Sequence, residues 1–268
     1  MLLIYSLVLP ACCRLATLLF LGTGGYIAGY AIKSIGLPFE LSILAGTFVA
    51  AAVGYLVGSL AIRRQGIYFS MITLALSQLI FFIYLQAPFT GGEDGIQGIP
   101  RGKLLGLIDL ENDLVFYDVV LSIFLFGFWL VYRTIHSPFG QILKSIRENE
   151  PRAISLGYDV DKYKLLAFVI SAGLAGMAGS TKTLALHLAS LTDVTWQASG
   201  EVVLMTLLGG LGTILGPVVG AIVVVTLQNY LASYGFWVTI IMGVIFVLCV
   251  LAFRRGIVGE LRAVFNRP

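Results

Sequence analysis

Residues 202–253 read VVLMTLLGGLGTILGPVVGAIVVVTLQNYLASYGFWVTIIMGVIFVLCVLAF, a run of 52 positions without Asp, Glu, Lys, Arg or His. A buried helix of a soluble protein typically has about 10–14 apolar residues, whereas a helix needs about 20 to cross the ~30 Å hydrocarbon layer of a membrane. Residues 41–62 and 65–92 are also free of charge. The sequence therefore predicts a protein that crosses a membrane several times.

The crossing segments should be α-helices, because a helix satisfies its own backbone polar groups and the alternating pattern of a membrane β-barrel is absent. We expect an all-α integral membrane protein, a polytopic helix bundle of about eight membrane segments forming a single transmembrane domain over residues 1–268. The predicted spans lie at about 15–33, 38–62, 67–87, 114–132, 165–188, 216–233 and 235–253, with a shorter apolar piece at 200–212.

The composition agrees with this class, since 58% of the residues are hydrophobic, 12% are charged and the mean hydropathy is +0.95. A cleavable signal peptide does not explain the apolar runs, because they recur along the whole chain. Cys12, Cys13 and Cys249 lie in apolar runs and suit small buried residues better than metal ligands or disulfides. The net charge of +3 indicates no nucleic-acid partner, because membrane topology accounts for the basic residues.

Basic residues accumulate in the cytoplasmic loops of membrane proteins. Twelve of the 17 Lys and Arg lie at Arg63–Arg64, in the segment 133–164 and in the C-terminal tail. The connection 88–118 has two basic residues against six acidic ones. We therefore expect 63–64, 133–164 and the C-terminus to be cytoplasmic and 88–113 to face outward. An even number of crossings must then separate the segment 133–164 from the C-terminal tail, because both are cytoplasmic. This holds only if the piece 200–212 crosses, or nearly crosses, the membrane inside the bundle.

Small residues spaced three or four apart indicate close helix packing, because such strips let helix backbones approach each other in lipid. A role in lining a permeation path is the alternative. The strips are Gly25 with Gly29, Gly54 with Gly58, Gly216 with Gly220, and the series Gly173, Gly176 and Gly179.

One cytoplasmic stretch, SIRENEPRAISLGYDVDKYK at 145–164, is unusually charged for this chain. Pro151 suits the first turn of a helix, and Gly157 suits its C-terminal stop. Apolar residues at helical spacing precede this stretch, so we expect two short amphipathic helices with a break at 148–151. Such a helix pair suits docking onto another protein. The alternative is a solvated loop whose basic residues only fix the topology.

Other site candidates carry weaker signals. The glycine-rich stretch GGLGT is interpreted as a tight turn between helices or as a broken helix beside a transport path. Glu201 is placed at a helix start, where a carboxylate is favoured, and Lys182 and His187 are placed at the outward end of a span, where Lys can reach the interface. The candidates for the translocation path or for a binding-protein contact are Thr90, Gly91, Gly92, Asp94, Gly95, Glu201, Gly209, Gly210 and Gly212.

Catalytic signatures are absent from the sequence. No G-x-x-x-x-G-K-S/T phosphate-binding loop occurs, so the chain is not expected to hydrolyse ATP. With two His and no acidic cluster at metal-ligand spacing, neither an intramembrane enzyme nor a cofactor or metal is expected.

Four stretches together resemble the membrane subunits of branched-chain amino acid ABC importers, in particular the second of their two homologous permeases. They are TGGEDGIQGIP (90–100), IRENEPRAISLGYDVDKYKLLAFVISAGLAGMAGS (146–180), SGEVVLMTLLGGLGTILGPVVGA (199–221) and FRRGIVGEL (253–261). The N-terminus departs from the family pattern, in which further helices usually precede, so we expect a truncated or altered start.

The resemblance implies a fold like that of type II ABC importers, in a bacterial inner membrane. It also implies three kinds of partner besides the lipid bilayer: a homologous permease that completes a heterodimer, two ATP-binding subunits and a periplasmic substrate-binding protein. Under this resemblance the segment 133–164 becomes the ATPase-coupling loop. Its candidate residues are Arg147, Glu148, Asn149, Glu150, Pro151, Arg152, Gly157 and Tyr158.

The predicted function is that of a permease subunit that translocates branched-chain amino acids or a related small polar solute. The alternative is a stand-alone secondary transporter or channel, which would usually have more charge within the membrane for ion coupling. The cargo stays open between branched-chain amino acids, other amino acids, urea, amides and small organic acids.

Overall fold

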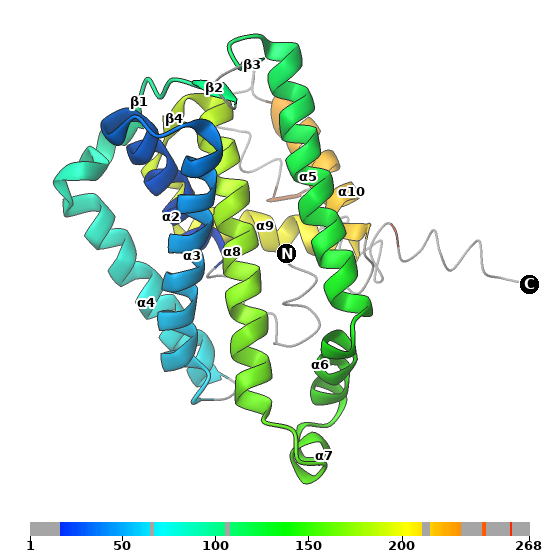
Figure 1. Cartoon of the computed structure of the whole chain (residues 1–268). Helices are drawn as coiled ribbons and strands as arrows, with labels where there is room; N and C mark the ends of the chain where they lie inside the picture. Colours follow the sequence, from blue (N-terminus) through cyan, green and yellow to red (C-terminus); the bar gives the residue numbers. More distant parts are fainter. Residues whose placement is uncertain are drawn as a thin grey trace, which may run out of the picture. The chain divides into compact units, whose positions relative to one another are not determined.

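The computed structural model describes residues 17–64, 67–104, 108–210, 215–231, 243–244 and 258. The described chain divides into a first compact unit, which ends at Ser199, and a second, which begins at Gly200. The first unit is a bundle of long helices with short helices at one end and short strands at the other (Figure 1).

Seven helices make up most of the first unit. They are α2 (Thr17–Tyr30, continued by a π-helical turn at Ala31–Ile35), α3 (Phe39–Ala61), α4 (Ile67–Gln86), α5 (Asp113–His136), α6 (Pro138–Glu148), α7 (Glu150–Ser155) and α8 (Val160–Leu186). Within the described residues, α2 with its π-turn, α3, α4, α5 and α8 are long and apolar enough to cross a membrane. These five helices match the first five predicted spans to within a few residues and confirm a helical membrane bundle.

The expected total of about eight segments stays a prediction. The span predicted at 235–253 lies outside the described residues, apart from Gly243 and Val244. The first two residues of the span predicted at 15–33 also lie outside them.

Helix α8 packs between α2 and α3, and small residues permit the close approach. A Cβ atom on Gly176 would collide with Ala50 of α3, and one on Gly179 would collide with the backbone of Leu21 in α2. Ser180 of α8 donates a hydrogen bond to the carbonyl oxygen of Gly24 at 3.0 Å. The small-residue strip on α8 is therefore a helix-packing surface, as the spacing of these glycines predicted.

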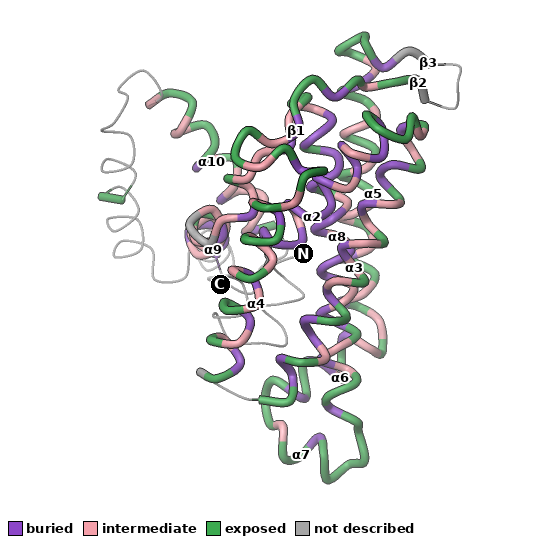
Figure 2. The backbone as a smooth tube through the Cα atoms, turned by 90° about the vertical axis from the view of Figure 1, so that its left-hand side faces the viewer, coloured by how far each residue is buried: buried purple, intermediate pink, exposed green. Residues whose placement is uncertain are grey.

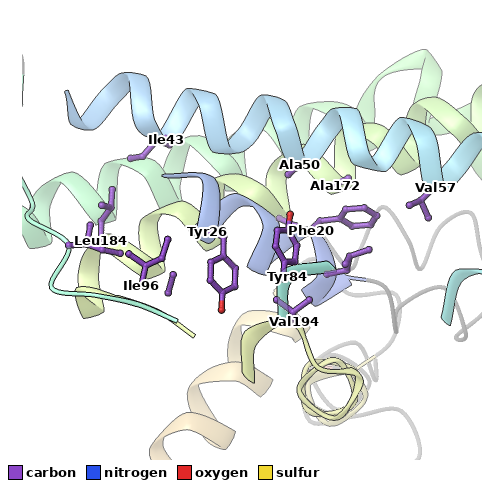
Figure 3. Packing of buried hydrophobic residues seen from close by; sticks show 14 of the residues in the cluster. Phe20, Tyr26, Ile43, Ala50, Val57, Tyr84, Ile96, Ala172, Leu184 and Val194 are labelled. Atoms are coloured by element: carbon purple, nitrogen blue, oxygen red, sulfur yellow. The ribbon is translucent and has the colours of Figure 1, made fainter. Parts of the chain in front are cut away.

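Apolar and aromatic side chains fill the rest of this core (Figure 3). The ring of Phe20 meets that of Phe168 edge to face, with centroids 5.5 Å apart, and Tyr26 stacks on Tyr84 at 5.3 Å. Both arrangements are favourable geometries for aromatic pairs. They fix α2 against α8 and against α4.

The outer helices are packed much less than α8. Only 11% of the apolar stretch of α5 is buried within the chain, whereas 61% of the apolar stretch of α8 is buried. Figure 2 shows the same contrast between the exposed surface of α5 and the buried surfaces of α2 and α8. The exposed residues on α5 include Leu125, Phe126 and Trp129. Such a surface suits contact with lipid or with another membrane subunit rather than with water.

Short elements cover the end of the bundle opposite α7 (Figure 1). They are the 3₁₀ turns η3 (Pro88–Thr90) and η4 (Gly92–Asp94), and the strands β1 (Ile96–Gln97), β2 (Lys103–Leu104), β3 (Ile108–Asp109) and β4 (Leu188–Ala189). A further 3₁₀ turn, η5 (Leu191–Val194), follows β4 and packs against α2. Strand β1 pairs antiparallel with β4, and β2 with β3. The first pairing ties the connection after α4 to the residues that follow α8. No strand was predicted, because two-residue strands leave no periodic signal.

The second unit contains most of α9 (Trp196–Gly209) and all of α10 (Gly216–Leu231). A Cβ on Gly209 would collide with the backbone of Gly216, and one on Gly220 with the carbonyl of Met205. The two helices therefore touch through glycines. With 14 residues, α9 spans only about 21 Å, so the crossing expected from the short apolar piece stays a prediction.

Candidate functional site

The charged segment between α5 and α8 forms two short helices, as predicted. Ser137 caps α6, where its hydroxyl accepts from the backbone N–H of Gly140 at 3.3 Å and Pro138 occupies the first turn. Asn149 ends α6 and caps α7, because its side-chain oxygen accepts from the N–H of Arg152 at 3.1 Å. Pro151 follows in the first turn of α7, where its missing N–H costs no hydrogen bond.

The end of α7 depends on a glycine. Gly157 has φ of 87°, in the left-handed region, and the N–H of Leu156 closes the last turn on the carbonyl of Arg152 at 3.1 Å. No atom lies within 4 Å of a Cβ built on Gly157. The backbone conformation, rather than lack of space, is therefore what favours glycine here.

Two sets of contacts fasten α6 and α7 to the start of α8. Lys164 of α8 and Glu150 of α7 form an ion pair with 2.7 Å between Nζ and Oε1, and Lys164 is only 8% exposed. Tyr163 of α8 stacks on Phe139 of α6 at 5.8 Å and meets Tyr158 edge to face at 6.1 Å. From the sequence, Lys164 was interpreted only as one of the basic residues that fix the topology. Its spacing from Glu150 did not predict the ion pair.

The surface of α7 and its following turn is exposed (Figure 2) and chemically mixed. Ile154 and Leu156 are 57% and 67% exposed, and Arg152 is exposed beside them. Arg147 and Glu148 are exposed at the end of α6. Exposed apolar side chains that share a short helix and its turn with an exposed arginine suit a protein contact, because such contacts are enriched in arginine around apolar residues.

A second ion pair lies beside this surface at the start of α8. The carboxylate of Asp159 caps the helix and lies 2.7 Å from Nζ of Lys162. Hydrogen bonds from the side chain and the backbone N–H of Lys162 lower the pKa of Asp159. Both side chains are largely exposed, so this pair is screened by water.

At the opposite end of the bundle, the residues predicted in the outward loop have mainly backbone roles. Thr90 is buried and donates to the carbonyl oxygens of Tyr84 and Ala87 at 2.5 and 2.7 Å. Gly91, Gly92 and Gly95 have φ of 76°, 62° and 68°. Asp94 is exposed and is the predicted residue here that can reach a partner.

The C-terminal end of α8 lies close to this loop. Lys182 forms an ion pair with Asp193 at 2.6 Å. His187 adopts a left-handed conformation with φ of 55°, and its Nδ1 lies 2.7 Å from the carbonyl oxygen of Ile99. The sequence placed both residues at the end of a span, and the structure adds a specific partner for each.

Three of the predicted candidates, Glu201, Gly209 and Gly210, lie in the second unit. Glu201 is not at a helix start, which corrects that prediction: α9 begins at Trp196, after Thr195, whose hydroxyl accepts from the N–H of Ala198 at 3.5 Å. Glu201 is exposed within α9 and accepts a hydrogen bond from Gln228 at 3.4 Å. Gly209 ends α9, Gly210 follows with φ of 113°, and Gly212 lies outside the described residues.

Among the described residues, no group of three or more His, Cys, Asp or Glu side chains is placed to hold a metal ion. The described chain thus presents membrane-spanning helices with a rigid exposed helix pair at one end. It is a multi-pass membrane protein with a candidate protein-docking element.

A sequence profile of the family described as "Branched-chain amino acid transport system / permease component" matches residues 13–250. The chain belongs to this family, and with its apolar helices it is a multi-pass inner-membrane protein.

Curated relatives agree with this assignment. The chain is 27% identical to the "High-affinity branched-chain amino acid transport system permease protein LivM" of Escherichia coli (strain K12), over 92% of this chain and 65% of the relative. It is 28% identical to the "Ribose import permease protein RbsC" of Bacillus subtilis (strain 168), over 69% of this chain and 58% of the relative. The "Autoinducer 2 import system permease protein LsrC" of Salmonella choleraesuis (strain SC-B67) is 27% identical over 90% of this chain and 66% of the relative.

The chain therefore spans about two thirds or less of the length of these relatives. All three relatives are named as permeases rather than as enzymes. No solved structure matches the chain.

Proposed function

We propose that this chain is the membrane-spanning permease subunit of an ATP-driven importer. The observation that supports this most directly is the α6–α7 pair, a capped, exposed element fastened to a membrane helix, in a member of a transport permease family. An element of this kind can receive a movement from a cytoplasmic protein and pass it to α8. The chain would then contribute the transport path, while separate subunits hydrolyse ATP.

The proposal includes the partners expected from the sequence: a homologous permease, two ATP-binding subunits and a periplasmic substrate-binding protein. Relatives named LivM and LivH from Methanocaldococcus jannaschii both match the chain, which supports a pair of homologous permeases. We assign Arg147–Tyr158 to the ATPase contact. We assign the loop around Asp94, at the opposite end of the bundle, to the binding-protein contact.

The proposed cargo is a branched-chain amino acid. The identity of 27% over 92% of this chain to a LivM protein supports this choice. Relatives named for ribose and autoinducer 2 import favour a second possibility, a small polar sugar-like solute, because their identities are similar.

Reconstitution tests the proposal. The chain would be placed in proteoliposomes with a homologous permease, an ATPase and a binding protein from the same organism, and uptake of radiolabelled leucine and ribose would be measured. We expect uptake of leucine only with ATP and all subunits present. The matched control carries an ATPase whose phosphate-binding lysine is replaced. Uptake by the chain alone, without ATPase, would contradict the proposal and favour a secondary transporter, whereas ATP-dependent uptake of ribose alone would change only the cargo.

A further inference from the structure

The buried ion pair between Glu150 and Lys164 joins α7 to α8 at a second point. The chain itself joins them at a first point, through the connection that contains Gly157 and Tyr158. A six-residue helix is too short to be stable by itself, so its orientation depends on what holds it. At its start α7 continues from α6 through Asn149, which caps it.

The connection between α7 and α8 does not by itself fix the orientation of α7 against α8. Gly157 has a positive φ and no atom within 4 Å of a potential Cβ, so little packing opposes rotation there. Glu150 lies at the other end of α7, at its first residue. The ion pair therefore ties the end of α7 that adjoins α6 directly to α8.

The short distance and the burial of the Glu150–Lys164 pair indicate that it holds the start of α7 at a defined position against α8. The two charged atoms are 2.7 Å apart, and the side chains of Lys164 and Glu150 are 9% and 27% exposed. Removing the carboxylate of Glu150 would leave the poorly solvated ammonium group of Lys164 without this ion pair. The neighbouring Lys162–Asp159 pair has the same charges, but its side chains are 80% and 52% exposed.

Movement received at α7 would then travel along one rigid helix. Helix α8 has 27 residues without interruption, a length of about 40 Å. After His187 the chain enters β4, whose Ala189 pairs with Ile96 of β1 at the opposite end of the bundle (Figure 1).

We propose that Glu150 and Lys164 form a latch that makes α7 and α8 move as one body, so that nucleotide-driven closure at α7 changes the opposite end of α8. This inference rests on the proposed function, because it assumes that an ATPase docks on α7. Lys164 is a positioning residue in it and touches neither nucleotide nor cargo.

The test measures movement at the far end of α8 in the complete complex in nanodiscs. Leu186, which is exposed at the end of α8, becomes the single cysteine in a background free of Cys12, Cys13 and Cys249. Labelling by a membrane-impermeant maleimide is compared without nucleotide and with ATP and vanadate. We expect a labelling ratio between the two states of ~3-fold or more with Lys164 intact and of about 1 with Lys164→Met.

Two controls separate a latch from a general loss of structure. Lys162→Met removes the same charge from the exposed Lys162–Asp159 pair, two residues before Lys164. This variant should keep the labelling ratio of the unsubstituted chain. Lys164→Arg and the exchange Glu150→Lys with Lys164→Glu keep opposite charges in place, and at least one of them should restore the ratio. Co-purification of the ATPase should be equal for Lys164→Met and Lys162→Met.

Three outcomes would overturn the latch. The first is a nucleotide-dependent ratio in Lys164→Met as large as that with Lys164 intact. The second is equal loss of the ratio in Lys162→Met. The third is the absence of any ratio above 1 with Lys164 intact while the ATPase is bound. Failure of the ATPase to bind even the unsubstituted complex would instead contradict the proposed function, and the latch with it.

Discussion

At the residue scale, the glycines of α8 differ in what a side chain would meet. A Cβ on Gly179 would lie closer than 3.0 Å to three backbone atoms of Leu21. A Cβ on Gly173 would lie 3.6 Å from Ala51, which is an ordinary contact. Both belong to one small-residue strip in the sequence, so the strip alone could not rank them.

This difference predicts opposite effects of the same substitution. Gly179→Ala should destabilise the protein by roughly 1–3 kcal/mol, because the backbone of Leu21 cannot rotate out of the way. Gly173→Ala should be neutral or stabilising by up to about 1 kcal/mol, because alanine favours the helix. The difference in stability is measured by heating each variant in detergent and monitoring the loss of folded protein by size-exclusion chromatography. Equal unfolding temperatures would show that the close α2–α8 contact does not exist in solution.

At the element scale, local signals in the sequence predicted the α6–α7 pair well. Pro151 and Gly157 mark the start and stop of α7 by chemistry that acts within one helical turn, and both are where the structure has them. The aromatic contacts of Tyr163 and the Glu150–Lys164 pair were not predictable. They join helices whose relative orientation depends on the α5–α6 and α7–α8 connections, and no periodic pattern encodes it.

The same reasoning explains the error at Glu201. The uncharged run begins just after Glu201, which suggested a helix start there. The structure begins α9 earlier, because the hydroxyl of Thr195 accepts from the N–H of Ala198 and so caps the helix before Trp196. Composition locates a membrane segment, whereas a cap locates its first residue.

The docking role of α7 gives a prediction at this scale. Arg152→Glu reverses an exposed charge while leaving the backbone N–H that Asn149 caps, so it should weaken ATPase co-purification by roughly ten-fold or more if Arg152 is a central contact. Gly157→Val should strain the left-handed turn by roughly 1–2 kcal/mol and reduce uptake.

Matched substitutions give the controls for α7. Gly157→Asn should be tolerated, because asparagine adopts left-handed conformations more readily than valine. Lys144→Glu reverses a charge on the exposed surface of α6 and should have the smaller effect on the ATPase. Normal co-purification and uptake in both Arg152→Glu and Gly157→Val would mean that the charged segment only fixes the topology.

At the scale of the first unit, hydropathy was sufficient to place five membrane helices, but it could not show how they pack. The runs at 38–62 and 114–132 look alike in the sequence. In the structure α3 packs against α2 and α8, whereas α5 leaves most of its surface exposed. Spans of equal hydropathy can face protein or lipid, since both environments are apolar, so only the small residues distinguished them in advance.

The charges of the first unit separate between the two ends of the bundle, and this gives the last prediction. Arg63 and Arg64 follow α3 at the same end as α6 and α7, while the acidic connection before α5 lies at the other end (Figure 1). By the positive-inside rule, the α7 end should be cytoplasmic and the β1–β4 end periplasmic. Helix α5, with 24 residues, is about 36 Å long and can separate the two sides.

Single cysteines at Ser145 and Glu93 test this orientation in a background free of Cys12, Cys13 and Cys249. Both positions are exposed, and neither caps a helix. In cells with a permeabilised outer membrane, an impermeant maleimide should label Glu93→Cys and leave Ser145→Cys unlabelled until the inner membrane is opened. Strong labelling of Ser145→Cys in cells with an intact inner membrane would reverse the orientation. It would also place the α6–α7 surface beyond the reach of any cytoplasmic ATPase, so the docking proposal depends on this result.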